Sequence, residues 1–184
     1  MGGIALAAAA DRPPGVRAMI AHLDLPVDLP KNELRLRRAV SEDLDALLRL
    51  LSDDPISAAR GDAKDRMERA AYAAALEEII DDPANDQLVV EHHGELVAMM
   101  QVTRTPGLAR GGSCRLTLEA VRVASHHRSL GIGTQLMRWA IDVAAVACGA
   151  SLVQLTSDAA RTDAHRFYTR LGFTASHTGF KYRV

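Results

Sequence analysis

Alternating apolar and polar positions predict the first strand and the first helix of this chain. Residues Glu33–Val40 alternate in the manner of a half-buried β-strand. Ser41 follows as a predicted N-cap, with acidic residues in the first turn after it. The apolar face of the predicted helix is formed by Leu44, Leu47, Leu48 and Leu51. A polar loop over 52–65 and a second helix over Arg66–Ile80 complete this part of the prediction.

The middle of the chain predicts a hairpin and a third strand. Residues 87–102 read as two strands that turn at His93 and Gly94. The strand over Arg115–Val123 follows a second loop. A long helix then begins near Ile132 and is closed by Gly149. Its predicted inward stripe consists of Ile132, Leu136, Ala140, Val143 and Ala147.

The end of the chain predicts three more strands and one helix. The nearly continuous apolar run over Ser151–Ser157 is typical of a central strand. Thr162 is a predicted N-cap for a helix that Gly172 ends, and two short strands are expected over 173–177 and 180–184. This order predicts an α/β fold with one mixed sheet of about six or seven strands and about four helices.

The N-terminal residues lack such a pattern. Residues 1–32 contain four prolines and an alanine-rich run, so we expect a poorly ordered leader before a single domain over 33–184. Met19 is an alternative translation start. The leader lacks the basic segment of a secretory signal, and position 6 does not fit a myristoylation site.

Composition and charge narrow the range of possible functions. The net charge of −1 gives no basic field for nucleic acid, and no apolar run approaches the roughly 18 residues of a membrane span. Two distant cysteines favour reduced thiols in a cytoplasmic protein. The histidine pairs 92–93 and 126–127 are read as strand neighbours on opposite faces, so we expect no metal site.

Candidate chemistry begins at the junction of the strand over Arg115–Val123 and the long helix. The segment contains Arg128, Ser129, Leu130, Gly131, Ile132, Gly133 and Thr134. A Walker loop would need a lysine before Thr134, and a dinucleotide motif would need glycine or alanine at position 136. A short anion-binding turn at a helix N-terminus remains, with Arg128 adding charge. The alternative is a simple tight turn with a solvated arginine.

Together with "LTSDAARTDAHRFYTRLGF", this segment resembles the GNAT superfamily of acyl-CoA-dependent N-acetyltransferases, over residues 34–184. "TPGLARGG" and "RTDAHRFYTRLGF" resemble a bacterial branch near the aminoalkylphosphonate acetyltransferases. The resemblance implies acetyl-CoA as co-substrate, with its pyrophosphate on the Arg128–Thr134 turn. It also implies coenzyme contacts from the backbone of Val121 and Val123 and from Ala164 and Phe167. Where many members have an asparagine that contacts the pantetheine arm, this chain has Asp158.

Acetyl transfer to an amine needs a base, because an alkylamine with a pKa near 10.4 is mostly charged at pH 7. Glu119 is the candidate, since strict alternation would place it on one face with Val121 and Val123. The alternative is a structural glutamate paired with Arg122. The resemblance also implies that a backbone amide near Val121 polarises the thioester carbonyl.

Tyr168 is the candidate acid for the departing thiolate. It shares a helical stripe with Ala164, Phe167 and Leu171, which points its ring inward. The resemblance places the family's usual proton donor here, whereas a core tyrosine would show the same pattern.

The acceptor is expected to be a small primary amine bound by the loops over 53–62 and 105–112. Asp53 and Asp54 are candidates for a cationic amine, and Arg60 or Arg110 for an acceptor's anionic group. Two other functions stay open: a non-catalytic acyl-CoA sensor or interaction module, and an acetyltransferase of protein lysines or N-termini. A homodimer is compatible with the sequence.

Overall fold

The computed structural model describes residues 19–53, 68–182 and 184. By internal contacts the chain divides into two compact units, Met1–Gln154 and Leu155–Val184. A six-stranded sheet runs in the sequential order β1 to β6. Its strands are β1 (Val27–Asp28), β2 (Leu34–Arg38), β3 (Asn85–His92), β4 (Glu95–Pro106), β5 (Cys114–Val123) and β6 (Leu152–Leu155).

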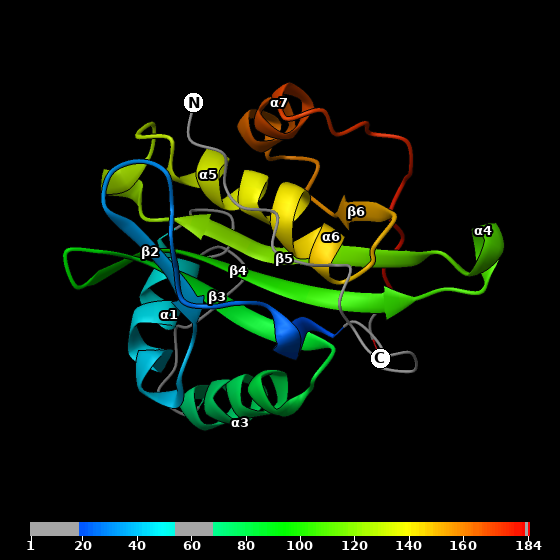
Figure 1. Ribbon diagram of the computed structural model, residues 1–184. Coiled ribbons are helices and arrows are strands. Elements are labelled where there is room, and N and C mark those ends of the chain that lie inside the picture. The colour runs from blue at the N-terminus through cyan, green and yellow to red at the C-terminus, as the bar shows by residue number, and fades with distance from the viewer. Residues whose placement is uncertain (1–18, 54–67, 183) are drawn as a thin grey trace. The chain divides into compact units, whose positions relative to one another are not determined.

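Strand directions confirm the expected mixed sheet. The pairs from β1 to β5 are all antiparallel. Figure 1 shows β6 running in the same direction as β5, and a helical crossover joins the two. The Ser151 amide donates to the Cys114 carbonyl at 2.9 Å, and Gln154 Nε2 donates to Thr117 Oγ1 at 3.1 Å.

Helices cover both faces of the sheet in the first unit (Figure 1). One face carries α1 (Leu44–Ser52) and α3 (Arg69–Asp81), and the other carries α5 (Ile132–Trp139) with its continuation. The expected hairpin turn is confirmed, because His93 and Gly94 both adopt positive φ between β3 and β4. Between β4 and β5 lies the short α4 (Ala109–Gly112).

A hydrophobic core lies between the sheet and the helices α1 and α3. Its buried members are Ala39, Leu44, Leu47, Leu50, Leu76, Val89, Met99 and Ala124. Leu48 and Leu51, which the sequence placed on the inward face, pack against this cluster only partly buried. Leu50 takes an inward position instead.

Two helix starts differ from the prediction. Ser41 is not an N-cap but the first residue of a 3-10 turn, η2 (Ser41–Asp43), and α1 begins at Leu44. The capping acceptor is Asp43, whose carboxylate accepts from the Val40 amide at 2.9 Å. Thr162 is likewise the first residue of α7 (Thr162–Arg170), and its predecessor Arg161 makes no side-chain cap.

The long helix also departs from its predicted stripe. A π-helical turn, η5 (Ala140–Ala144), separates α5 from α6 (Ala145–Ala147). Its extra residue rotates the following turn. Ala144 and Cys148 are therefore fully buried, in place of Val143 and Ala147.

The C-terminal prediction is wrong in two respects. Within the described part of 173–184 no residue belongs to a strand. The strand over 151–157, expected to be central, is the short β6 at one end of the strand order. A short apolar run does not by itself distinguish a central strand from an edge strand, and β6 has no fully buried residue.

The leader prediction is wrong for residues 19–32, whereas residues 1–18 lie outside the described part of the chain. Ile20 in η1 (Ile20–His22) is 0% exposed, and Leu23 and Leu29 are also buried. Val27 and Asp28 pair with β2 as strand β1. Prolines 26 and 30 therefore flank an added edge strand.

Arg38 fastens this segment to the sheet. Its guanidinium donates to the carbonyls of Ile20 and Leu23 at 3.0 and 3.2 Å and pairs with Asp86 at 2.6 Å. Burial raises the pKa of the Asp86 carboxyl to about 6, although the charge of Arg38 acts in the opposite direction. Because this pKa exceeds the ordinary value of 3.8, Asp86 contributes stability at low pH that is lost as pH rises from about 4 through 6.

The buried start of the described chain gives a stability prediction. Leu23→Ala should lower the free energy of unfolding by about 2–5 kcal/mol, because it leaves a cavity in a packed site. The matched control is Leu108→Ala, which deletes the same atoms from a side chain that is 97% exposed and should change stability by less than about 0.5 kcal/mol. Urea denaturation of both variants measures the difference. If Leu23→Ala lowered the free energy of unfolding as little as the control does, residues 19–32 would not stabilise the fold.

Candidate active site and coenzyme-binding turn

An irregularity in β5 determines where Glu119 points. On β4, Met99 and Gln101 are two residues apart, whereas their partners Arg122 and Glu119 are three apart. The extra residue forms a β-bulge, within which Ala120 has a φ of 48°. Neither Ala120 nor Val121 has a cross-strand partner on β4.

The bulge overturns the predicted common face of Glu119, Val121 and Val123. Glu119 lies opposite Gln101, and Val123 lies opposite Ala98. Cross-strand partners share a face, and positions 98 and 101 of β4 point to opposite faces. Glu119 is thus on the face of Met99, where α1 and α3 pack, while Val123 is on the other face. Strict alternation cannot anticipate an inserted residue.

Glu119 is exposed, and its carboxylate has no ion pair or hydrogen bond with any described residue. The structural alternative, pairing with Arg122, is therefore not observed. Arg122 instead donates from Nη1 to the Val121 carbonyl at 2.9 Å. A carboxylate that no arginine neutralises remains able to accept a proton from a substrate.

The predicted anion-binding turn is built from residues in left-handed conformations. Ser129 has a φ of 65° and Gly131 a φ of 80°, and α5 begins immediately afterwards at Ile132. No side chain caps this helix start. The amides of its first turn are thus directed at the position where an anion would bind, with the positive end of the helix dipole behind them.

Arg128 is oriented differently from the expectation of a guanidinium facing an incoming anion. Its Nε donates to the Val123 carbonyl at 3.2 Å, and its Nη2 donates to the Asp53 carbonyl at 2.9 Å. The Asp53 carboxylate also accepts from the Ser125 amide. Arg128 and Asp53 therefore connect the end of α1 to the start of the turn.

Sequence reasoning missed two supports of this turn, Lys31 and Asn32. The Lys31 amide donates to Gln135 Oε1 at 2.8 Å, and Asn32 Nδ2 donates to the Leu130 carbonyl at 3.0 Å. Both lie in the segment that was predicted to be a leader. The positive φ of Asn32, 66°, is a conformation that asparagine tolerates well, but the sequence does not mark its distant partner.

A cavity of about 910 Å³ lies on the α1 side of the first unit. Its lining combines residues of α1, of the β3–β4 hairpin and of the segment after β5. The carboxylates in this lining are Glu42, Asp43, Asp45, Asp53, Glu91 and Glu95, against the two arginines Arg37 and Arg49. Glu119 is not part of the lining.

Arg37 holds one wall of this cavity in place. Its guanidinium binds both oxygens of Asp43 at 2.6 and 2.9 Å, and its Nε donates to Glu91 Oε1 at 2.9 Å. The hydrogen bonds from Arg37 keep the pKa of the Asp43 carboxyl below its ordinary value. Among the predicted acceptor residues, Asp53 lies in this lining, Arg110 is exposed in α4, and Asp54 and Arg60 lie outside the described residues.

The second unit contains the remaining predicted site residues. Ala164, Phe167, Tyr168 and Leu171 are all half-buried, so they form the expected common stripe of α7. The Tyr168 ring packs between Phe167, at a centroid distance of 5.3 Å, and Phe173, at 5.9 Å.

Asp158 organises the turn before α7. Its carboxylate accepts from the Ala160 amide at 2.9 Å, and its carbonyl accepts from the Arg161 amide at 3.0 Å. His165 Nε2 lies 2.9 Å from the same carbonyl. Asp158 therefore has a local structural role, whatever it contacts in addition.

Comparison with known proteins identifies the family. The model of the acetyltransferase (GNAT) family matches residues 44–173. The chain therefore belongs to the GNAT family and is an acyltransferase, and this family uses acetyl-CoA as co-substrate. An aminoalkylphosphonate N-acetyltransferase of Salmonella typhimurium strain LT2 is 30% identical over 145 residues, covering 79% of this chain and 88% of that protein.

Solved structures agree on the fold. A protein of Bacillus halodurans C-125, described as a transcriptional regulator, is 41% identical with a TM-score of 0.77, covering 82% of this chain and 99% of that chain. A Trypanosoma brucei acetyltransferase, 24% identical with a TM-score of 0.63 and the same coverages, shares the fold. No described helix is long and apolar enough to cross a bilayer.

The turn gives a binding prediction. Gly131→Glu places bulk and negative charge at the helix start, so coenzyme A should no longer raise the melting temperature. In the wild type, coenzyme A at 100 times its Kd should stabilise by about 2.7 kcal/mol. Gly112→Glu is the matched control, because Gly112 has a similar φ of 82° and equally open surroundings. A normal coenzyme shift in Gly131→Glu would show that the anion binds elsewhere.

Proposed function

We propose that the protein transfers the acetyl group of acetyl-CoA to a primary amine of a small molecule by direct attack. The observation that carries this proposal is Glu119, whose carboxylate pairs with no described residue, at the β5 bulge in the strand that leads to the Arg128–Thr134 turn. The strand β5 thus supplies a candidate base, Glu119, and two residues, Ala120 and Val121, whose backbone is not paired with β4. The same strand leads to the helix start that is proposed to bind an anion.

The coenzyme is proposed to bind with its pyrophosphate on the amides of Gly131–Thr134 and its pantetheine arm along β5. The backbone of Val121 and Val123 would contact this arm, joined by Asp158, Ala164 and Phe167. Because the bulge removes Ala120 and Val121 from pairing with β4, a backbone amide there can donate to the thioester oxygen. Donation to that oxygen stabilises the charge that develops during attack.

The reaction forms a C–N bond and breaks the C–S bond. Glu119 accepts a proton from the ammonium group, directly or through water, and the neutral amine attacks the carbonyl carbon. Tyr168 gives its proton to the departing thiolate, and the second proton that the nitrogen loses on becoming an amide restores the tyrosine hydroxyl. The products are an N-acetylated amine and coenzyme A.

The acceptor class is supported by the cavity on the α1 side. Its excess of carboxylates favours a cationic ligand, and Asp53 and Glu95 are both part of its lining. Glu119 lies on the same face of the sheet as α1. These features support an amine that approaches from this side, and thiol release with a panel of small amines identifies which one.

Glu119→Gln tests the base. It retains the size of the side chain but cannot accept the proton, so turnover at neutral pH should fall by roughly 10²-fold. Raising the pH should restore much of the activity, because the free amine then becomes abundant. Glu77→Gln, an exposed change on α3, is the control. A deficit of the same size at every pH would assign Glu119 a structural or binding role.

Tyr168→Phe tests the acid. The change keeps the ring between Phe167 and Phe173 and removes one hydroxyl, so coenzyme binding should be retained. We expect kcat to fall about 10- to 100-fold with little change in KM for acetyl-CoA, because the lost interaction acts mainly in the transition state. Tyr182→Phe, at a residue that is 91% exposed, should behave like the wild type. Wild-type kcat in Tyr168→Phe, where chemistry limits the rate, would make this tyrosine a packing residue.

A further inference from the structure

Histidines from two distant segments meet in the first unit. His92 ends β3 and His93 begins the hairpin turn, whereas His126 and His127 lie in the 3-10 turn η4 (Ser125–His127). The ring centroids of His92 and His127 are 5.5 Å apart, and those of His126 and His127 are 4.4 Å apart. Glu95, the first residue of β4, joins them, with its Oε1 3.1 Å from His126 Nε2.

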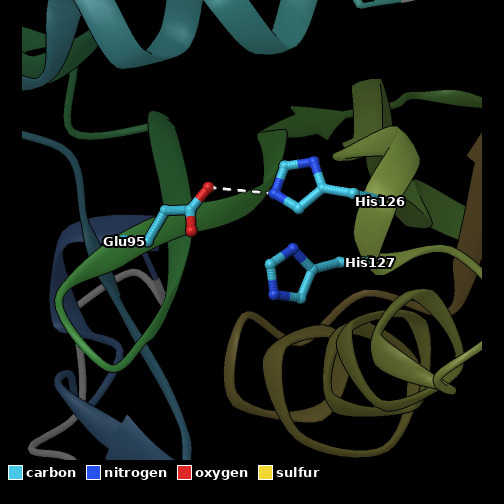
Figure 2. A group of neighbouring side chains, drawn as sticks. All are labelled: Glu95, His126 and His127. Carbon is cyan, nitrogen blue, oxygen red and sulfur yellow. Dashed lines mark hydrogen bonds and ion pairs between the residues drawn. The ribbon is translucent and has the colours of Figure 1, made fainter.

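Three of these side chains converge on one point. Glu95, His126 and His127 each offer one ligand atom, and these atoms all lie within 4.8 Å of one another. Figure 2 shows the Glu95 carboxylate and the two imidazole rings directed toward a common space. Ligand atoms around a tetrahedral ion with bonds of about 2.1 Å are roughly 3.4 Å apart, so small rotations of the exposed Glu95 and His126 side chains would complete the geometry.

A second observation points to a ligand at this place. The Nδ1 atom of His127 is buried and has no hydrogen-bond partner among the described residues. In Figure 2 this nitrogen, next to the attachment carbon of the ring, points toward the His126 ring. A buried ring nitrogen without a hydrogen-bond partner destabilises the fold, and a coordinated cation would offset this cost.

The sequence argued against a metal here because neighbours on a strand point to opposite faces. That premise is wrong for His126 and His127, which occupy a 3-10 turn rather than a strand. Consecutive residues of such a turn are separated by about 120°, so both rings can reach one side. Glu95 is more than thirty residues away in sequence and comes within reach only through the pairing of β4 with β5.

We propose that Glu95, His126 and His127 bind a divalent transition-metal ion of the zinc, cobalt or nickel class. Two imidazole nitrogens and one carboxylate oxygen suit these ions, whereas calcium and magnesium prefer oxygen ligands alone. Three protein ligands leave a position for water or another ligand. Glu95 and His126 also line the cavity on the α1 side, so this position would be accessible from there.

The proposed ion would lie directly beside the turn that follows η4. Arg128 follows His127 directly, and the coenzyme-binding turn begins there. A bound ion would join the β3–β4 hairpin to η4 and so restrict the segment from which Arg128 reaches the Val123 and Asp53 carbonyls. The ion therefore has a positioning role for the turn, separate from the chemistry assigned to Glu119.

Calorimetry on tag-free, chelator-treated protein tests the site. Titration with zinc chloride should show one saturable site, and cobalt should give the visible absorption of a bound ion with nitrogen ligands. His126→Ala and Glu95→Gln should each weaken zinc binding at least about 100-fold, because loss of a ligand exceeds the 10- to 100-fold effect of losing a supporting hydrogen bond. Both residues are exposed, so these variants should fold even if His127→Ala does not.

Two controls separate this site from general binding to surface histidines. His22→Ala removes an exposed imidazole elsewhere in the unit, and His93→Asn removes the imidazole that lies against His92 beside the cluster while suiting the positive φ of that position. Both should bind zinc like the wild type. Absence of a saturable site, or equal affinity in His126→Ala and the wild type, would overturn the proposal. Each readout is binding, so the result is independent of acetyl transfer.

Discussion

The antiparallel pairing of β4 with β5 is the interaction on which the candidate site depends. It holds β5 inside the sheet, between β4 and the edge strand β6, with α1 and α3 on one face and α5 on the other. The bulge at Ala120 and Val121 interrupts this pairing without ending it, because Arg122 and Val123 resume the ladder. The resumed ladder continues into a hydrogen bond from the Ala124 amide to the Val97 carbonyl at 2.8 Å, which fixes where η4 begins. Glu119, the backbone of Val121 and the histidines of η4 all take their positions from this one strand.

The turn proposed to bind the coenzyme depends on parts of the chain that its own motif does not include. Arg128 and Asp53 connect it to α1, and Lys31 and Asn32 connect it to the segment before β2. That segment is in turn held by Arg38 through two carbonyls and by burial of Ile20. A helix start that binds an anion must keep its amides directed at the ligand, and these distant hydrogen bonds restrict the positive-φ residues that precede it. Packing of the N-terminal segment is thereby linked to the geometry of the turn.

Charged side chains on the α1 side have two different roles. Arg37 pairs with Asp43 and Glu91 together, so these carboxylates connect β2, η2 and β3, and one of their two negative charges is balanced by the guanidinium. Asp53 and Glu95 are held instead by an amide and by a histidine, both of which leave the carboxylate charge uncompensated when the histidine is neutral. The cavity thus retains a negative potential at the end near η4, where the proposed ion and a cationic acceptor would both be attracted.

The sequence by itself determined the elements whose signals are local. The hairpin turn at His93 and Gly94, the strand that contains Glu119, the turn around Gly131 before α5 and the stripe of Tyr168 all follow from periodicity and backbone preferences of neighbouring residues. Each of the two segments on which the family resemblance depends is likewise continuous in the sequence. Such features need only interactions between residues a few positions apart, and for that reason they can be read without a structure.

Only the tertiary structure decided the features that depend on pairing between distant segments. The bulge in β5 is defined by its register with β4, which the sequence of β5 does not contain. Alternation along β5 alone therefore predicted one common face for Glu119 and Val123, whereas they lie on opposite faces. The π-turn after α5 shifted burial from Val143 to Ala144. Residues 19–32 bury their apolar side chains only in the assembled fold, and no local pattern in the sequence indicates this packing. Glu95 met His126 and His127 through the same strand pairing. Register and packing are set by the free energy of the whole fold, which no local pattern contains.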